Sequence, residues 1–250
     1  MNHSRSPRLL IILLALAIAG CSAVGSGGGA PSSTTSVETL EYYPYQVKGY
    51  QNSYPRRSIA ILIPTDALDR SGPNAAPLGD QPAVGIVTDQ LDNVTSRLFS
   101  PPLPGIVQNA IGHSAEEAGL QATALNQSNY DSDAKLNADY VLAPQITKCW
   151  VKKHRGPDGM HGSTWTTQAE FAMLIVVYKP PFKIPFWEGT SSQTYFDPPV
   201  GSFGLGPDDE AGIYDRPGQV LSVAMTRAVA GIFENDSLRT LIQTDRMTSH

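Results

Sequence analysis

The apolar and polar positions along the chain predict alternating strands and helices. The short apolar run Ser58–Pro64 is rich in branched residues, which is typical of a central strand buried on both faces. Turn-forming residues predict a loop over 65–82. From Val84 to Leu98 the apolar residues recur at steps of three and four, which favours an amphipathic helix, while Val and Thr in this stretch leave a strand open. A strand, a loop and a helix are therefore expected in this order.

A second helix and a short strand are predicted next. Pro104 suits the first turn of a helix, the apolar pattern continues to Ala118, and Gly119 is placed to cap the helix end. Leu120–Leu125 is then predicted as a short strand and 131–137 as a helical turn. These segments continue the alternation of helix and strand.

An antiparallel meander is predicted in the second half of the chain. Apolar residues alternate with period two over Ala138–Val151, where Pro144 indicates an edge or a bulge. Two further strands are expected at Thr164–Lys179 and Phe186–Phe196. The turn-formers and charges of Lys152–Ser163 predict a hairpin loop between the first two of these strands. Three consecutive strands with short connections make a meander, whose apolar face needs a cover.

A C-terminal helix supplies that cover. It is predicted from about Pro217, with Arg227 looking outward, and its apolar face consists of Val220, Leu221, Ala224, Ala228, Ile232 and Phe233. A last turn or short helix is expected over Ser237–Asp245. The sequence thus predicts an α/β fold, a two-layer sandwich in which one mixed, mostly antiparallel sheet of about 4–6 strands has helices packed on one face.

The first residues carry the parts of a bacterial lipoprotein signal. Two arginines precede the apolar run Leu9–Ala19, which is too short to span a bilayer but suits a signal peptide. The run ends in a pattern that fits the lipobox, Ile18, Ala19, Gly20 and Cys21. Residues 18–20 are therefore the predicted signal-peptidase recognition site, and Cys21 is the predicted site of lipidation by a diacylglyceryl group.

Three segments follow from this signal. Residues 1–20 are the predicted signal peptide, 21–53 the lipidated cysteine with a flexible or extended tether, and 54–250 a single periplasmic α/β domain. Ser22, which is not Asp, favours the outer membrane by the sorting pattern of Gram-negative lipoproteins. The tyrosines between Tyr42 and Tyr54 predict an extended lead-in that packs its rings on the domain, with a partner-binding or glycan-stacking strip as the alternative.

Charge and cysteine content narrow the function. Loss of residues 1–20 removes two arginines and leaves 16 basic against 23 acidic residues, a formal charge of −7. An acidic surface repels phosphate backbones, so nucleic acid is not an expected partner. Cys149 has no second cysteine to pair with once Cys21 is acylated. It is predicted to be a small buried residue, with a reactive thiol as the alternative.

One stretch of the sequence carries candidate binding chemistry. Lys152, Lys153, His154 and Arg155 form a positive patch on an acidic protein and are the predicted partner-binding loop, for an anionic lipid headgroup or protein face. His154, Asp158 and His161 have ligand types suited to zinc, but solvated loop residues are the preferred interpretation. Gly201–Gly206 lacks the Rossmann spacing and the Walker lysine. No nucleophile elbow or zincin motif occurs, so no catalytic site, metal or cofactor is predicted.

Three stretches resemble a known family. They are Asp139–Leu142, Thr166–Phe171 and Val220–Ile242, and together with the lipobox they resemble the YajG-type envelope lipoproteins. The layout is more distantly similar to the small α/β domains of outer-membrane lipoproteins that activate penicillin-binding proteins and of curli-secretion lipoproteins. The resemblance implies a non-enzymatic role and supplies no site residues. Pro180-Pro181 and Gly201–Gly206 depart from the family.

These features support three hypotheses of function. The favoured one is a non-enzymatic accessory, anchored in the outer membrane through Cys21, that binds another envelope protein. The second is a carrier of lipid or another apolar ligand, or an auxiliary component of envelope transport, suggested by an aromatic face of Trp150, Trp165, Phe186 and Trp187. The third, a hydrolase of envelope polymers, needs convergent acids that the sequence does not reveal.

Overall fold

One mixed nine-stranded sheet and three helices make up the described part of the chain. A computed structural model describes residues 34–44, 54, 57–132, 136–159, 162–200 and 216–245. The α/β class is confirmed, and the sheet is larger than the 4–6 strands predicted. The lipobox with Cys21, the signal peptide, His161 and the glycine-rich loop 201–206 lie outside the described residues.

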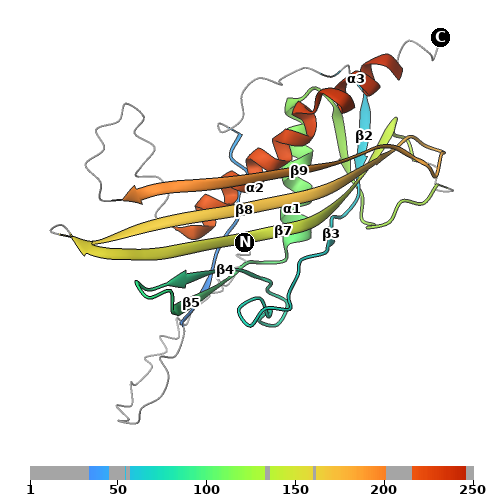
Figure 1. Ribbon diagram of the computed structural model, residues 1–250. Helices are drawn as coiled ribbons and strands as arrows, with labels where there is room; N and C mark the ends of the chain where they lie inside the picture. Colours follow the sequence, from blue (N-terminus) through green and yellow to red (C-terminus); the bar gives the residue numbers. More distant parts are fainter. Residues whose placement is uncertain are drawn as a thin grey trace, which may run out of the picture. The chain divides into compact units, whose positions relative to one another are not determined.

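The elements follow one another as Figure 1 shows. The strands are β1 (Thr34–Val37), β2 (Ser58–Ile61), β3 (Thr65–Asp66), β4 (Ala83–Thr88), β5 (Val94–Phe99), β6 (Gln121–Ala124), β7 (Tyr140–Gly159), β8 (Gly162–Tyr178) and β9 (Pro185–Val200). The helices are α1 (Leu103–Glu117), α2 (Pro217–Glu234) and α3 (Asp236–Asp245). The predicted meander, both long helices and the short last helix are thereby confirmed.

The long strand β7 organises the sheet. On one side it pairs with β8, which pairs with β9 in the antiparallel meander. On its other side three strands lie parallel to it in turn, namely β2, β3 and β4. Pro144 lies between Leu142, the last partner of β2, and Gln145, the first partner of β3. A residue without an N–H is thus placed where β7 changes neighbours and not on an outer edge.

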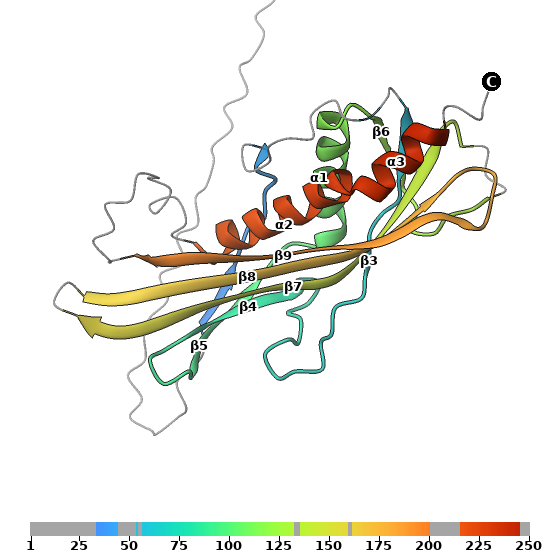
Figure 2. The ribbon, with the colours of Figure 1, turned by 45° about the horizontal axis from the view of Figure 1, so that its top comes forward.

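The core lies between the meander and the helices. Alternate residues of β8 are fully buried and face α2, and they are Ala169, Phe171, Met173, Ile175 and Val177. Figure 2 shows α2 and α3 along the same side of β8 and β9, with α1 beside α2. Cys149 is 3% exposed on this core side, and burial raises the pKa of its thiol. The prediction of a small buried residue is confirmed.

The predicted helix from Val84 to Leu98 is wrong. The segment forms β4 and β5, an antiparallel pair joined by the turn Asp89–Asn93. The Asp89 carboxylate accepts hydrogen bonds from the backbone N–H groups of Leu91 and Asn93, at 2.9 and 2.8 Å. A short acidic side chain that bonds the backbone two residues on stabilises a turn, and the branched residues on either side favour strands. The spacing of apolar residues at steps of three and four could not distinguish this hairpin from a helix.

The predicted hairpin loop Lys152–Ser163 is also largely strand. β7 continues to Gly159 and β8 begins at Gly162. Lys152, Lys153 and His154 pair with successive residues of β4 and with β8, so they are central in the sheet at this level. The polar composition predicted a loop because the hairpin extends beyond the apolar core, where strand residues need not be apolar.

The described residues of the lead-in, 41–44 and 54, pack on the domain as predicted, and Tyr45 and Tyr50 lie outside the described residues. Tyr54 is 4% exposed, and its hydroxyl donates to the carbonyl of Phe233 at 2.9 Å. The backbone N–H groups of Glu41 and Tyr43 donate to hydroxyls of α2, on Ser222 and Thr226, at 3.0 and 2.9 Å. Among the described helices, none is both long enough and apolar enough to cross a bilayer.

Candidate functional site

The predicted partner-binding residues Lys152, Lys153, His154 and Arg155 lie together on β7, but their charges have partners within the domain. The Lys152 ammonium lies 2.9 Å from the Asp92 carboxylate, and the hydrogen bond and charge of Lys152 lower the pKa of Asp92. His154 Nδ1 lies 2.9 Å from the Thr88 hydroxyl, and Lys153 lies over the Trp165 ring. The positive patch is therefore partly neutralised.

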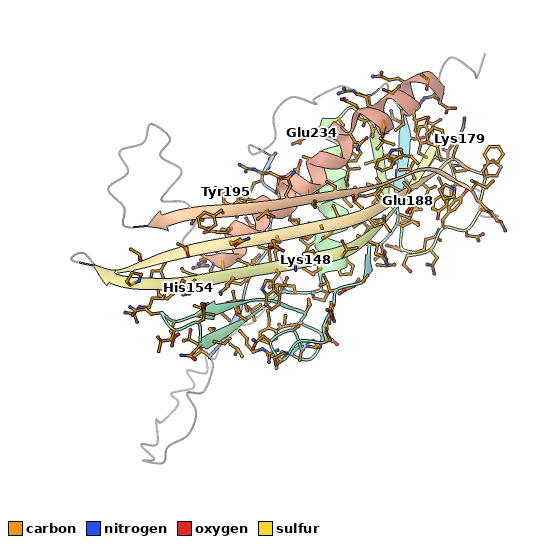
Figure 3. All side chains as sticks on the ribbon, viewed as in Figure 1. Lys148, His154, Lys179, Glu188, Tyr195 and Glu234 are labelled. Atoms are coloured by element: carbon orange, nitrogen blue, oxygen red, sulfur yellow. The ribbon has the colours of Figure 1, made fainter. Side chains whose placement is uncertain are left out.

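The metal interpretation of this region gains no support. His154, labelled in Figure 3, faces the turn between β4 and β5. No cluster of three or more His, Cys, Asp or Glu residues suited to a metal occurs among the described residues. His161 lies outside those residues, so the triad of His154, Asp158 and His161 stays untested.

The tip of the β8–β9 hairpin presents two exposed apolar side chains. Phe182 is 61% exposed and Ile184 is 78% exposed, in a turn that contains Pro180 and Pro181. The turn is closed by a 2.9 Å hydrogen bond from the N–H of Phe182 to the carbonyl of Lys179. Lone exposed apolar residues are ordinary, but two large ones at the tip of a projecting hairpin form a surface suited to a partner.

Contacts with the end of α3 hold the base of this hairpin. Asp245 accepts a hydrogen bond from the Tyr140 hydroxyl at 2.8 Å and pairs with the Lys179 ammonium. Burial acts to raise the pKa of Asp245, but the hydrogen bonds from Lys179 and Tyr140 and the nearby cations lower it overall. Burial also raises the pKa of Tyr140, and Asp245 adds to this effect. The last residue of α3 thus joins β7 to the hairpin that carries Phe182 and Ile184.

The tip lies at the opposite end of the sheet from Thr34, the first residue of β1. Adjacent strands bring five residues to one level, namely Thr34, Ser96, Val87, Lys153 and Thr167. From Thr167 to Tyr178, at the base of the tip, β8 extends about 35 Å at the usual rise per strand residue. Figure 1 shows the β8–β9 tip at one end and the β4–β5 hairpin toward the other.

A cleft lies between residues 40–44 and α1. Its volume is about 700 Å³, and it is lined by Leu40, Glu41, Tyr42, Pro44, Ile106, Asn109, Ala110, His113, Glu116 and Glu117. The Tyr42 ring stacks on the His113 ring, with centroids 6.1 Å apart and planes at 17°. The Tyr42 hydroxyl donates to Glu117 Oε2 at 2.8 Å. The cleft therefore combines an apolar floor with carboxylates and two stacked rings.

The four predicted aromatic residues do not share one face. Trp187 pairs with Val177, whose side chain is in the core below α2, and its indole N–H donates to Ser237 at 2.9 Å. Trp150 pairs with Glu170 on the opposite face. Directly paired residues in an antiparallel sheet point to the same side, so Trp150 and Trp187 are on opposite faces. The prediction of a shared aromatic face, which suggested a carrier, is therefore wrong.

Sequence reasoning missed the tip and the cleft for different reasons. The run Lys179-Pro-Pro-Phe-Lys-Ile-Pro185 was a signal for the tip, because prolines bound two apolar residues in a hairpin turn. No local signal exists for the cleft, since Tyr42 and Glu117 meet only in the folded chain.

No family model and no curated protein matches the chain. Solved structures that are similar to it include a DUF330 protein from Xanthomonas campestris, with a TM-score of 0.47, 10% identity and coverage of 86% of this chain and 100% of the other. A neuraminyllactose-binding hemagglutinin homolog from Helicobacter pylori has a TM-score of 0.40, 10% identity and coverages of 81% and 98%. The hypothetical protein CT253 from Chlamydia trachomatis has a TM-score of 0.40, 9% identity and coverages of 76% and 99%. These values assign no function, and the resemblance to YajG-type lipoproteins stays a prediction.

Proposed function

We propose that this protein is an outer-membrane lipoprotein, anchored through Cys21, that binds another envelope protein through the β8–β9 tip and acts as a non-enzymatic accessory. The observation that carries this proposal is the exposure of Phe182 and Ile184 at one projecting tip. Full burial of an exposed apolar side chain contributes roughly 1.5–3 kcal/mol, so two such residues can anchor a protein interface.

The tip is prepared for binding before a partner arrives. Pro180, Pro181 and Pro185 fix backbone angles in and beside the turn, and Asp245 holds its base through Lys179 and Tyr140. A segment that is already ordered loses less conformational entropy when it binds. This arrangement favours a binding element over a plain connection between two strands.

The position of the tip within the sheet also supports this function. β1 begins at Thr34, and the tip lies beyond the other end of β8. Phe182 and Ile184 are therefore exposed at the end of the sheet away from Thr34, the first described residue after the proposed anchor.

Site-specific photocrosslinking in intact envelopes tests the contact. A benzophenone amino acid replaces Phe182 or Ile184, and Leu91 is the matched control because it is 82% exposed at the β4–β5 turn. We expect a defined envelope protein to crosslink from positions 182 and 184 and not from 91. The same crosslinks from all three positions, or none from 182 and 184, would overturn the proposed contact.

Fractionation tests the anchor separately. Mass spectrometry of the mature chain is expected to show diacylglyceryl cysteine at position 21, in the outer-membrane fraction. Cys21→Ala should leave the protein unacylated and released from that fraction. Retention of Cys21→Ala in the outer-membrane fraction would contradict the lipoprotein assignment.

A further inference from the structure

We propose that the cleft between residues 40–44 and α1 binds a basic side chain, arginine or lysine, of a partner polypeptide. This goes beyond the proposed function, because the cleft is a second surface, formed by other elements than the β8–β9 tip. Its volume of about 700 Å³ lies within the usual range of ligand-binding clefts.

The charge of the cleft favours a cation. Three of its lining residues are glutamates, Glu41, Glu116 and Glu117, and neither lysine nor arginine lines it within the described part of the chain. Glu116 and Glu117 lie in the last turn of α1, which has no basic residue. A helix C-terminus carries partial negative charge and is stabilised by cations, so two glutamates there add repulsion. A bound guanidinium or ammonium group would relieve that repulsion.

The carboxylate wall is held in place before binding. The Tyr42 hydroxyl donates to Glu117 Oε2 at 2.8 Å and so holds a carboxylate that lines the cleft. The backbone on either side of Tyr42 is hydrogen bonded to Ser222 and Thr226 of α2. The Tyr42 and His113 rings lie nearly parallel, which supplies a flat aromatic surface of the kind that guanidinium groups contact.

The floor of the cleft suits a long side chain better than an inorganic ion. Leu40 and Ala110 are buried and Ile106 is half-buried, so the bottom is apolar. Arginine and lysine carry apolar stems below a charged head, and such stems pack on apolar surface while the head stays near carboxylates. A metal ion would make no use of this floor, and no metal-binding cluster occurs among the described residues.

Calorimetric titration of the full-length protein in nonionic detergent tests the proposal. The probe is the capped peptide acetyl-Leu-Arg-Leu-Arg-Leu-amide, and its control carries citrulline in place of both arginines. Citrulline has nearly the shape of arginine without its charge. We expect saturable binding of the arginine peptide and at least tenfold weaker binding of the citrulline peptide. Equal affinities, or no binding of the arginine peptide, would overturn the proposal.

Charge-matched variants locate the site. The double variant Glu116→Gln/Glu117→Gln keeps an acceptor for the Tyr42 hydroxyl and should lower the affinity for the arginine peptide at least tenfold. The control Glu188→Gln/Glu234→Gln removes the same charge at two exposed positions outside the cleft, labelled in Figure 3, and should change affinity less than twofold. An equal loss of affinity in both double variants would mean that the peptide is attracted by the net charge of the protein alone, and it would refute the site.

A third variant separates this inference from the proposed function. Phe182→Ser/Ile184→Ser should lose the envelope crosslink and bind the arginine peptide like the wild type. Loss of peptide binding in this variant would show that the peptide binds at the tip and not in the cleft.

Discussion

The two hairpins at opposite ends of the sheet are stabilised in opposite ways. In the β4–β5 turn, the Asp89 carboxylate accepts hydrogen bonds from two backbone N–H groups and from the Asn93 side chain, and Asp92 pairs with Lys152. The β8–β9 turn is held at its base by Asp245, a residue from a different element. The first turn is stabilised mainly by its own residues, because the exposed pair of Asp92 with Lys152 contributes little, and the second depends on the end of α3.

This difference bears on what each hairpin is for. Leu91 is exposed on a turn that is held mainly by its own polar groups. The order of this turn therefore gives no reason to expect a binding partner at Leu91. Phe182 and Ile184 are exposed on a turn braced by α3, and the brace keeps a pair of apolar side chains away from the core. We infer a structural role for the first hairpin and a binding role for the second.

The largest effect is expected where β4 meets β7. A Cβ at Gly85 would lie 2.1 Å from the carbonyl oxygen of Val151, so the strands must separate in Gly85→Ala. We expect a loss of about 3 kcal/mol or more in the free energy of unfolding, since a backbone clash cannot relax by a rotamer change. Urea denaturation of the full-length chain measures this loss.

Gly105→Ala is the matched control for that prediction. A Cβ at Gly105 meets nothing within 4 Å, and the residue lies in α1. Alanine is the better helix former, so a gain of about 0.5 kcal/mol is expected. A Gly85→Ala protein as stable as Gly105→Ala would mean that β4 and β7 are not packed as closely as described.

The brace of the β8–β9 hairpin gives the next largest effect. Asp245→Asn removes the charge that pairs with Lys179 and weakens the bond from Tyr140, so a loss of about 1–2 kcal/mol is expected at neutral pH. Because the pKa of Asp245 is lowered in the folded protein, its contribution is complete above the unfolded pKa of about 4 and declines as the pH falls through the folded pKa.

Chemical denaturation between pH 2.5 and 7 checks this dependence. The difference between wild type and Asp245→Asn should be constant from pH 5 to 7 and should shrink below about pH 4. Asp236→Asn is the control, because Asp236 is exposed and pairs with Arg239 on the same helix. A difference that grows toward low pH would have the wrong sign for this brace.

The meander shows which part of the fold the sequence could predict. β8 is apolar at every position from Phe171 to Tyr178, and α2 is apolar over most of its length, so the local sequence was enough to predict a buried strand and a buried helix. It was not enough for 84–98, where apolar spacing fitted a helix while Asp89 and the branched residues made a hairpin. β7 was predicted too short because β4 adds to its polar half, a neighbour that no local pattern reveals.

The candidate sites were less predictable than the fold. Lys152 and His154 were recognised as charged residues close in sequence, but their partners Asp92 and Thr88 come from another hairpin. Asp245 contacts Lys179, which is 66 positions away in the sequence, and Tyr140, which is 105 positions away. In the cleft, Tyr42 contacts Glu117, which is 75 positions away. Contacts of this length depend on the tertiary fold, so a sequence pattern cannot indicate them.

Substitutions at the exposed apolar residues should scarcely change stability. Phe182→Ser/Ile184→Ser and Leu91→Ser are each expected to alter the free energy of unfolding by less than about 0.5 kcal/mol, because these side chains pack little in the folded domain. Thermal unfolding followed by circular dichroism measures this. A large loss for the pair at 182 and 184 would indicate a structural role and would remove the contrast between the two hairpins.

The smallest effect tests whether conformation or charge orders the β4–β5 turn. Asp92 has a φ of 62°, a left-handed conformation that asparagine and glycine adopt more readily than alanine. Its ion pair with Lys152 is exposed, and exposed pairs contribute little to stability. We therefore expect Asp92→Asn and Asp92→Gly to melt close to the wild type, and Asp92→Ala to melt below both. If Asp92→Asn and Asp92→Ala instead melt equally far below the wild type, the charge of Asp92 stabilises the turn, and the two hairpins then share a dependence on residues outside their own turns.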